Sequence, residues 1–206
     1  MTMNYVWYAS YGSNLSRDRF LCYIKGGKPK GSEKIEVGCE DQSLPINEAT
    51  YKMNYPLYFA KESSRWQEQG VAFIGLEKDN KCQSYSRKYL ITVGQFMDVI
   101  KQENNGSKLN VVLDEVIEHG LKTIKDSWYG TILHLGEADG YPIFTFTADW
   151  DLDVSFNKPS KEYLSMIIHG LRKTLELNKS EIINYLVTKP GVAGAYSRHD
   201  IEKLIN

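Results

Sequence analysis

Residues 5–17 read YVWYASYGSNLSR, and this stretch decides the fold. Its first part, Tyr5 to Ser10, is aromatic and β-branched, which is typical of a buried strand rather than a half-exposed one. Gly12 then interrupts the strand, and glycine tolerates positive φ and lets the backbone come close to a ligand. Helix-capping residue types follow at positions 13, 14 and 16, and an apolar stripe suited to a short helix runs through positions 15, 20, 21 and 24. The pattern predicts a buried strand, a tight turn and the start of a helix.

The turn has two interpretations. Unpaired N–H groups at the start of a helix favour an anion such as a carboxylate, which makes the turn a candidate binding site. The alternative is a well-capped turn without any ligand, because short motifs have many chance matches.

The five residues Tyr11, Gly12, Ser13, Asn14 and Leu15 resemble the signature loop of the γ-glutamylcyclotransferase-like family. Members of that family release 5-oxoproline from γ-glutamyl peptides or amines, and they are small mixed α/β proteins built on a compact barrel. Their loop holds the γ-glutamyl group. The resemblance therefore implies that these five residues bind a small-molecule γ-glutamyl substrate.

The composition is that of an ordinary globular protein, with 206 residues, 42% hydrophobic residues and a net charge of −1. This size predicts one domain, or one domain with an extension. A net charge near zero provides no basic field, so we expect neither nucleic acid nor a membrane as a partner. No apolar run approaches the roughly 20 residues of a membrane span, and the N-terminus lacks a signal-peptide pattern. The sequence does not specify the oligomeric state.

Three cysteines, Cys22, Cys39 and Cys82, are widely spaced and odd in number. This pattern favours reduced thiols, so we expect a cytoplasmic protein. The four histidines show no metal-ligand spacing, and we expect no metal site.

The rest of the chain predicts an α+β fold. Residues 25–50 are polar and rich in glycine and lysine, and should be mostly loop. Further strands are predicted at residues 55–60, 70–75, 85–91, 128–135 and 141–147, the second and third of these forming a hairpin. Residues 111–117 suit either a strand or a helix. Helices are predicted to begin at Ser160, Asn178 and Ser197. We expect a small mixed β-barrel domain over residues 1–150 and a C-terminal helical extension, residues 151–206, packed on the barrel.

One predicted helix carries a candidate base. Thr92 and Gln95 have the spacing of a capping box, and an apolar face follows at Phe96, Val99 and Ile100. The next position on that face is Glu103. Partial burial and the negative end of the helix dipole would both raise the pKa of Glu103 and make it a better base. The alternative is a frayed last turn in which Glu103 points to water.

The family resemblance extends to this helix. Family members place the catalytic glutamate at a helix end, in a pattern often written Leu-Asp-x-x-Glu-Gly, and residues 99–104 match it with Glu103 in the catalytic position. Ile100 or a neighbouring residue stands in place of the aspartate, and Asn104 in place of the glycine. The resemblance implies that Glu103 is the general acid/base.

The implied chemistry is cyclisation of a γ-glutamyl amide by its own α-amine. That amine has a pKa near about 8 and is mostly protonated at neutral pH, so a positioned base must remove a proton. The reaction requires neither a protein nucleophile nor a metal or cofactor. A second hypothesis is a non-catalytic binding module that retains the pocket, because a fold does not guarantee chemistry. A serine or cysteine hydrolase has little support, since Ser13 is not in a nucleophile elbow.

Overall fold

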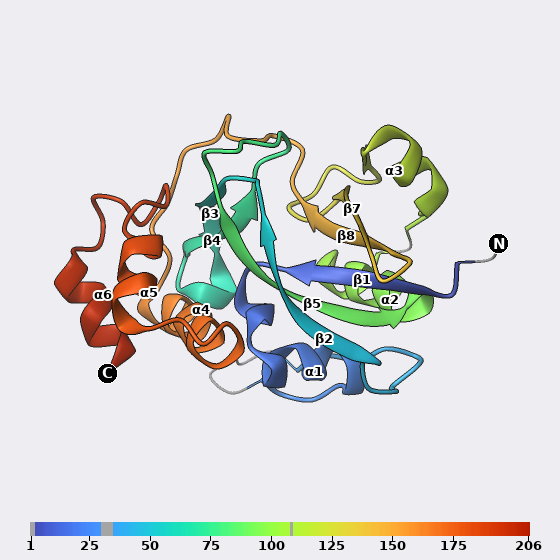
Figure 1. Cartoon of the computed structure of the whole chain (residues 1–206), viewed down its shortest axis with the longest axis horizontal. Helices are drawn as coiled ribbons and strands as arrows, with labels where there is room; N and C mark the ends of the chain where they lie inside the picture. Colours follow the sequence, from blue (N-terminus) through green and yellow to red (C-terminus); the bar gives the residue numbers. More distant parts are fainter. Residues whose placement is uncertain (1–2, 30–34, 108) are drawn as a thin grey trace.

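The computed structural model describes residues 3–29, 35–107 and 109–206 (Figure 1). The strands are β1 (Tyr5–Ser10), β2 (Asn47–Met53), β3 (Leu57–Ser63), β4 (Gln69–Ile74), β5 (Ser84–Thr92), β6 (Leu121–Thr123), β7 (Thr131–Ala138) and β8 (Tyr141–Thr147). The helices are α1 (Arg17–Lys25), α2 (Val93–Glu103), α3 (Leu113–His119), α4 (Lys161–Thr174), α5 (Lys179–Leu186) and α6 (Arg198–Ile205), with the 3₁₀ turns η1 (Ser13–Leu15) and η2 (Ser64–Trp66).

The sheet is open, and the prediction of a barrel is wrong. Among the described residues, six strands form one mixed sheet in the order β2-β5-β1-β8-β7-β6, and β3 and β4 form a separate two-stranded sheet. In the large sheet β2 and β6 are the edges, and they do not pair with each other. The small sheet meets the segment before α4 instead, through single bridges from Ala60 to Phe156 and from Gly70 to Pro159. Among the described strands, none joins β2 to β6, so the large sheet does not close into a barrel.

The predicted hairpin between the strands near residues 70–75 and 85–91 is also wrong. β4 pairs with β3, whereas β5 lies between β1 and β2 and pairs antiparallel with both. A turn at residues 79–82 lies between β4 and β5, but it belongs to a longer connection that carries the chain from the small sheet to the large one. A turn signal in the sequence shows where the chain bends. It does not determine whether the strands before and after the bend pair with each other.

The stretch that opens the chain is a buried strand, as predicted. Trp7 and Ala9 belong to one hydrophobic core, and Val6 and Tyr8 belong to another, because successive side chains of a strand point to opposite faces. Both faces of β1 are therefore covered, which explains why every second residue is not polar.

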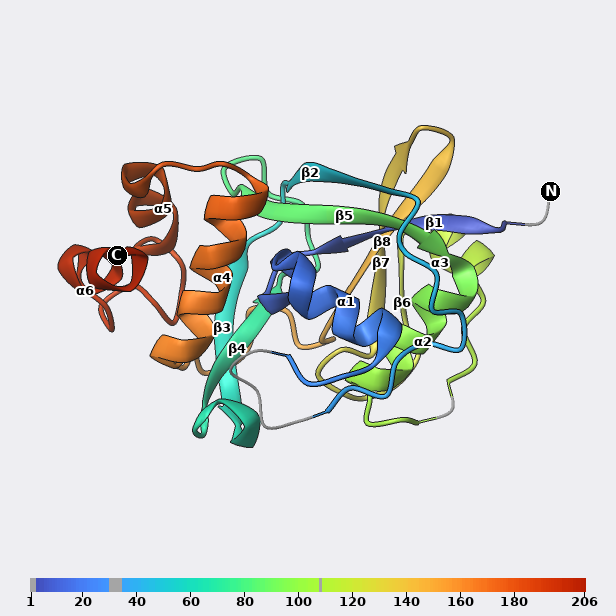
Figure 2. The same cartoon turned by 90° about the horizontal axis from the view of Figure 1, so that it is seen from below.

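The two cores are covered by different helices. The core around Val6 and Tyr8 receives apolar side chains from α1, α2 and α3. The core around Trp7 and Ala9 receives side chains from β3, β4 and the C-terminal helices α4, α5 and α6. Figure 2 shows α1 between α4 and α2, with α5 and α6 at the far end of the molecule. The core around Trp7 and Ala9 contains side chains from both before and after residue 150. The domain boundary at residue 150 stays a prediction.

Local signals located the helix starts correctly. Thr92 and Gln95 form the predicted capping box of α2, and Ser160, Asn178 and Ser197 cap α4, α5 and α6 with their side chains. The ambiguous segment at residues 111–117 contributes to helix α3.

Of the predicted loop at residues 25–50, residues 30–34 lie outside the described part of the chain. The predicted end of this loop at residue 50 is wrong, because the polar edge strand β2 begins at Asn47. Cys22, Cys39 and Cys82 carry free thiols. Over the described residues, the helices are too short or too polar to cross a membrane.

Candidate active site

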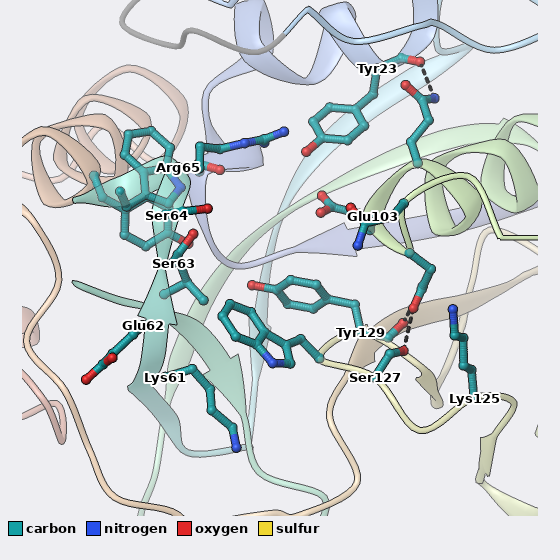
Figure 3. A pocket seen from close by; sticks show the side chains of 18 of the residues that line it. Tyr23, Lys61, Glu62, Ser63, Ser64, Arg65, Glu103, Lys125, Ser127 and Tyr129 are labelled. Atoms are coloured by element: carbon teal, nitrogen blue, oxygen red, sulfur yellow. Dashed lines mark hydrogen bonds between the residues drawn. The ribbon is translucent and has the colours of Figure 1, made fainter. Parts of the chain in front are cut away.

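A cavity of about 1040 Å³ lies where α1, the small sheet, the end of α2 and the loop before β7 meet (Figure 3). Its walls come from segments that are far apart in the sequence. The lining residues are Ser13, Arg19, Tyr23, Lys61, Glu62, Ser63, Ser64, Arg65, Trp66, Val71, Gln102, Glu103, Asn104, Asn105, Lys125, Asp126, Ser127, Trp128, Tyr129, Trp150 and Tyr163.

Glu103 is the last residue of α2 and lines this cavity. The apolar face of α2 is fully buried at Phe96, Val99 and Ile100, as predicted, and this packing directs the following position of the face inward. Figure 3 shows the Glu103 carboxylate facing Tyr23, Arg65 and Tyr129 across the cavity. The alternative in which Glu103 frays into water does not occur here.

Burial raises the pKa of Glu103 above its ordinary value, because a desolvated carboxylate is harder to charge. Three groups act in the opposite direction: the Tyr23 hydroxyl, which donates a hydrogen bond to the carboxylate, and the guanidinium groups of Arg65 and Arg19. Burial prevails, so the pKa of Glu103 is raised overall. A carboxyl group of this kind is suited to exchange protons near neutral pH.

The neighbours of Glu103 in the sequence hold the cavity walls together. The Gln102 side-chain amide donates to the carbonyl of Tyr23 at 3.0 Å, which ties α2 to α1. The buried Asn104 side chain donates to the carbonyl of Tyr129 at 3.1 Å and accepts a hydrogen bond from the Ser127 hydroxyl. Asn104 therefore fixes the loop that carries Tyr129.

The loop of residues 11–15 contributes less to the cavity than the sequence predicted. Of its five residues, Ser13 lines the cavity. The side chains of Tyr11, Asn14 and Leu15 are buried in the protein, and the Tyr11 hydroxyl donates to the carbonyl of Phe146 at 2.8 Å. A substrate-binding role stays a prediction for all five residues.

Gly12 is needed for a reason other than positive φ, since its φ is −106°. A Cβ atom at this position would lie 3.0 Å from the hydroxyl oxygen of Tyr163 on α4. Gly12 therefore permits the close approach of another side chain.

Sequence reasoning missed the cationic and aromatic partners of Glu103. Arg19 and Tyr23 are four residues apart on α1, a spacing that places them on one helix face, and this signal could have found them. Arg65 follows β3 in η2 and forms an ion pair with Glu36 at 3.1 Å. No pattern in the sequence connects Arg65 to Glu103, because only the tertiary structure brings them together. Over the described residues, no group of three histidine, cysteine or acidic side chains could hold a metal ion.

Comparison with protein-family models gives no match. A curated relative from Arabidopsis thaliana, described as histone deacetylase 5, is 35% identical over 208 aligned residues, which cover 90% of this chain and 31% of that protein. The chain thus spans about a third of the length of this relative.

Comparison with solved structures shows the fold. The crystal structure of the uncharacterized protein loc79017 from Homo sapiens aligns over 98% of both chains, with a TM-score of 0.53 and 14% identity. A structure described as a gamma-glutamyl cyclotransferase covers 98% of both chains with a TM-score of 0.49 and 13% identity. A yeast cyclotransferase described as specific to glutathione covers 98% of this chain and 96% of its own, with a TM-score of 0.42 and 11% identity.

Proposed function

We propose that the chain is a γ-glutamylcyclotransferase-like enzyme that releases 5-oxoproline from a γ-glutamyl amide, with Glu103 as general acid/base. The observation that carries the proposal is the position of Glu103. It is half-buried in a large cavity, its pKa is raised, and the same cavity receives Ser13 from the loop that resembles the family's signature.

In the proposed reaction, the α-amine nitrogen of the substrate attacks the carbonyl carbon of its own γ-amide. A new carbon–nitrogen bond closes the five-membered ring, and the bond from that carbon to the leaving nitrogen breaks. Glu103 removes a proton from the attacking amine and returns a proton to the leaving amine. The raised pKa of Glu103 brings it nearer to that of an amine, which eases both transfers.

The cavity is larger than a glutamyl group requires, so the remaining space is available to the leaving group. Glutathione, γ-glutamyl amino acids and γ-glutamyl amines are the candidate substrates. The proposed partner is thus a small molecule, with no nucleic acid or membrane, which agrees with a net charge of −1. The three free thiols favour a cytoplasmic location.

The second candidate is a binding module that keeps the pocket without catalysis. Two observations favour it. The Arabidopsis relative is about three times as long as its matched part, as expected where such a unit is joined to others. Three of the five loop residues are also buried in the protein, so selection for folding alone would retain them.

The experiment is a panel of γ-glutamyl compounds scored for 5-oxoproline, with an acetyl-lysine peptide included because of the relative's name. We expect turnover of at least one γ-glutamyl compound. Glu103→Gln should lower that turnover by about 10²- to 10⁴-fold, the usual effect of losing a positioned acid or base.

The matched control is Glu118→Gln, an exposed carboxylate on α3, which should leave turnover unchanged. If Glu103→Gln is as active as the parent, Glu103 is not the base. If the parent releases no 5-oxoproline from any compound but binds some of them, the binding module is the better description. Release of acetate from the peptide would instead assign the relative's named activity to this part of the protein.

A further inference from the structure

Arg19 is a buried cation that forms no ion pair with a carboxylate of the described residues. Its side chain lines the cavity, yet the residue is only 4% exposed. The guanidinium lies against the rings of Trp66, at 5.5 Å, and Tyr23, at 6.0 Å. Its Nε donates to the Ser13 hydroxyl at 2.7 Å, whereas Nη1 has no hydrogen-bond partner. A desolvated charge in this state is costly unless an anion compensates it.

The second arginine of the cavity shows what is missing. Arg65 forms an ion pair with the buried Glu36 at 3.1 Å, so its charge is compensated within the protein. Arg19 and Glu103 attract each other electrostatically, but Arg19 forms no ion pair with a described carboxylate. The carboxylate of Glu103 accepts a hydrogen bond from the Tyr23 hydroxyl instead. Of the two arginines, Arg19 is the one left for a ligand.

A carboxylate is the ligand that fits this arrangement. A guanidinium binds carboxylates through parallel N–H donors, and its planar fork is held in place here by Ser13 and two aromatic rings. An α-amino acid carries its carboxylate and its amine on the same carbon. One such group could therefore present the carboxylate to Arg19 and the amine to Glu103, which line the same cavity.

We propose that Arg19, positioned by Ser13, binds the free α-carboxylate of the substrate. This inference rests on the proposed function for the identity of the ligand. It makes the α-carboxylate the group by which Arg19 selects the substrate, so α-esters and 4-aminobutyryl amides should be poorer substrates than γ-glutamyl amides with a free α-carboxylate. It also explains why Ser13 reaches the cavity when Tyr11, Asn14 and Leu15 do not.

The kinetic test compares a γ-glutamyl amide with the 4-aminobutyryl amide of the same leaving group, which lacks only the α-carboxylate. The parent should prefer the γ-glutamyl amide. Arg19→Gln should raise KM for the γ-glutamyl amide by about 10- to 100-fold, the range for losing a hydrogen bond to a charged group, and leave the 4-aminobutyryl amide unchanged. Arg19→Lys keeps the charge without the fork and should restore part of the preference. A variant that impairs both compounds equally would show that Arg19 is only structural.

The matched control is Arg17→Gln, on the same helix. The Arg17 side chain is 42% exposed and pairs with Glu48 at 2.7 Å, and it is not part of the cavity wall. This variant should keep the parent's preference between the two amides. If Arg19→Gln does not fold, the comparison of the parent with Arg19→Lys decides the question, because any loss of preference then comes from the fork alone.

A binding measurement separates this inference from the proposed reaction. Calorimetry with 5-oxoproline and with 2-pyrrolidinone, which lacks the carboxylate, requires no turnover. We expect 5-oxoproline to bind the parent more tightly than 2-pyrrolidinone, and the difference to disappear in Arg19→Gln. Carboxylate-dependent binding without 5-oxoproline release would retain Arg19 and overturn the reaction. Turnover with the same carboxylate preference in Arg19→Gln would retain the reaction and overturn the role of Arg19.

Discussion

The loop of residues 11–15 follows β1 and helix α2 follows β5, two neighbouring strands of the large sheet, but the loop and the end of α2 differ in how many of their residues line the cavity. Tyr11, Asn14 and Leu15 are at most 6% exposed, and only Ser13 of the loop lines the cavity. At the end of α2, by contrast, four consecutive residues, 102–105, line it. The most recognisable motif of the sequence thus packs three of its five side chains into the protein, whereas the weaker motif directs a carboxylate to the cavity.

The reason for this difference is helix α4. Gly170 of α4 packs so closely on the loop that an added Cβ would lie 2.5 Å from the Cβ of Leu15. Tyr163, two turns earlier on the same face of α4, places its hydroxyl beside Gly12 and accepts a hydrogen bond from the N–H of Ala72 at 3.2 Å. The loop is held between the sheet and α4. The last residues of α2, by contrast, are open to the cavity.

Replacement of a helix glycine should separate the two regions most strongly. Gly170→Ala should lower the free energy of unfolding by about 1–3 kcal/mol, because α4 must move away from Leu15. Gly94→Ala, in α2, is the control: the nearest heavy atom to the new methyl is 3.8 Å away, and the variant should gain up to about 1 kcal/mol from helix propensity. Urea denaturation of the two variants measures both effects. Equal stability would mean that α4 does not hold the loop.

A smaller loss of stability is expected from Gly12→Ala. The new methyl would lie 3.0 Å from the Tyr163 hydroxyl oxygen, which should cost about 1 kcal/mol as the tyrosine shifts. Because the φ of −106° lies outside the left-handed region, we expect the contact with Tyr163 to account for most of the cost. The check is a double-mutant cycle with Tyr163→Phe, in which the two changes should couple by at least about 0.5 kcal/mol. Additive effects would place the strain elsewhere.

The smallest expected effect is a gain in stability, in contrast to the losses expected for Gly170→Ala and Gly12→Ala. The folded-state pKa of Glu103 is raised, so its contribution to stability is fully present below the ordinary carboxyl pKa and is lost as pH rises through the raised value. Glu103→Gln cannot ionise and should be slightly more stable than the parent at pH 7, with the gain disappearing in acid. Urea denaturation at pH 4 and pH 7 tests this, with the exposed Glu118→Gln as control. A loss of stability at pH 7 that is absent in acid would contradict the raised pKa.

Several parts of the site could be predicted from the sequence because their causes are local. The capping box at Thr92 and the apolar face that follows it placed Glu103 at an inward-facing helix end. The partners of Glu103 could not be predicted in the same way. Arg65 comes from η2 and Tyr129 from the loop before β7, and neither position has a periodicity or a cap that points to α2.

The sequence by itself determined the buried strand β1, the start of α2, and the caps at Ser160, Asn178 and Ser197, because hydrophobic periodicity and capping act over a few residues. Only the tertiary structure decided that β4 pairs with β3, that the large sheet stays open, and that Arg19 shares a cavity with Glu103. Strand pairing and cavity walls depend on contacts between segments far apart in the chain. A local sequence pattern does not determine which distant segments come into contact.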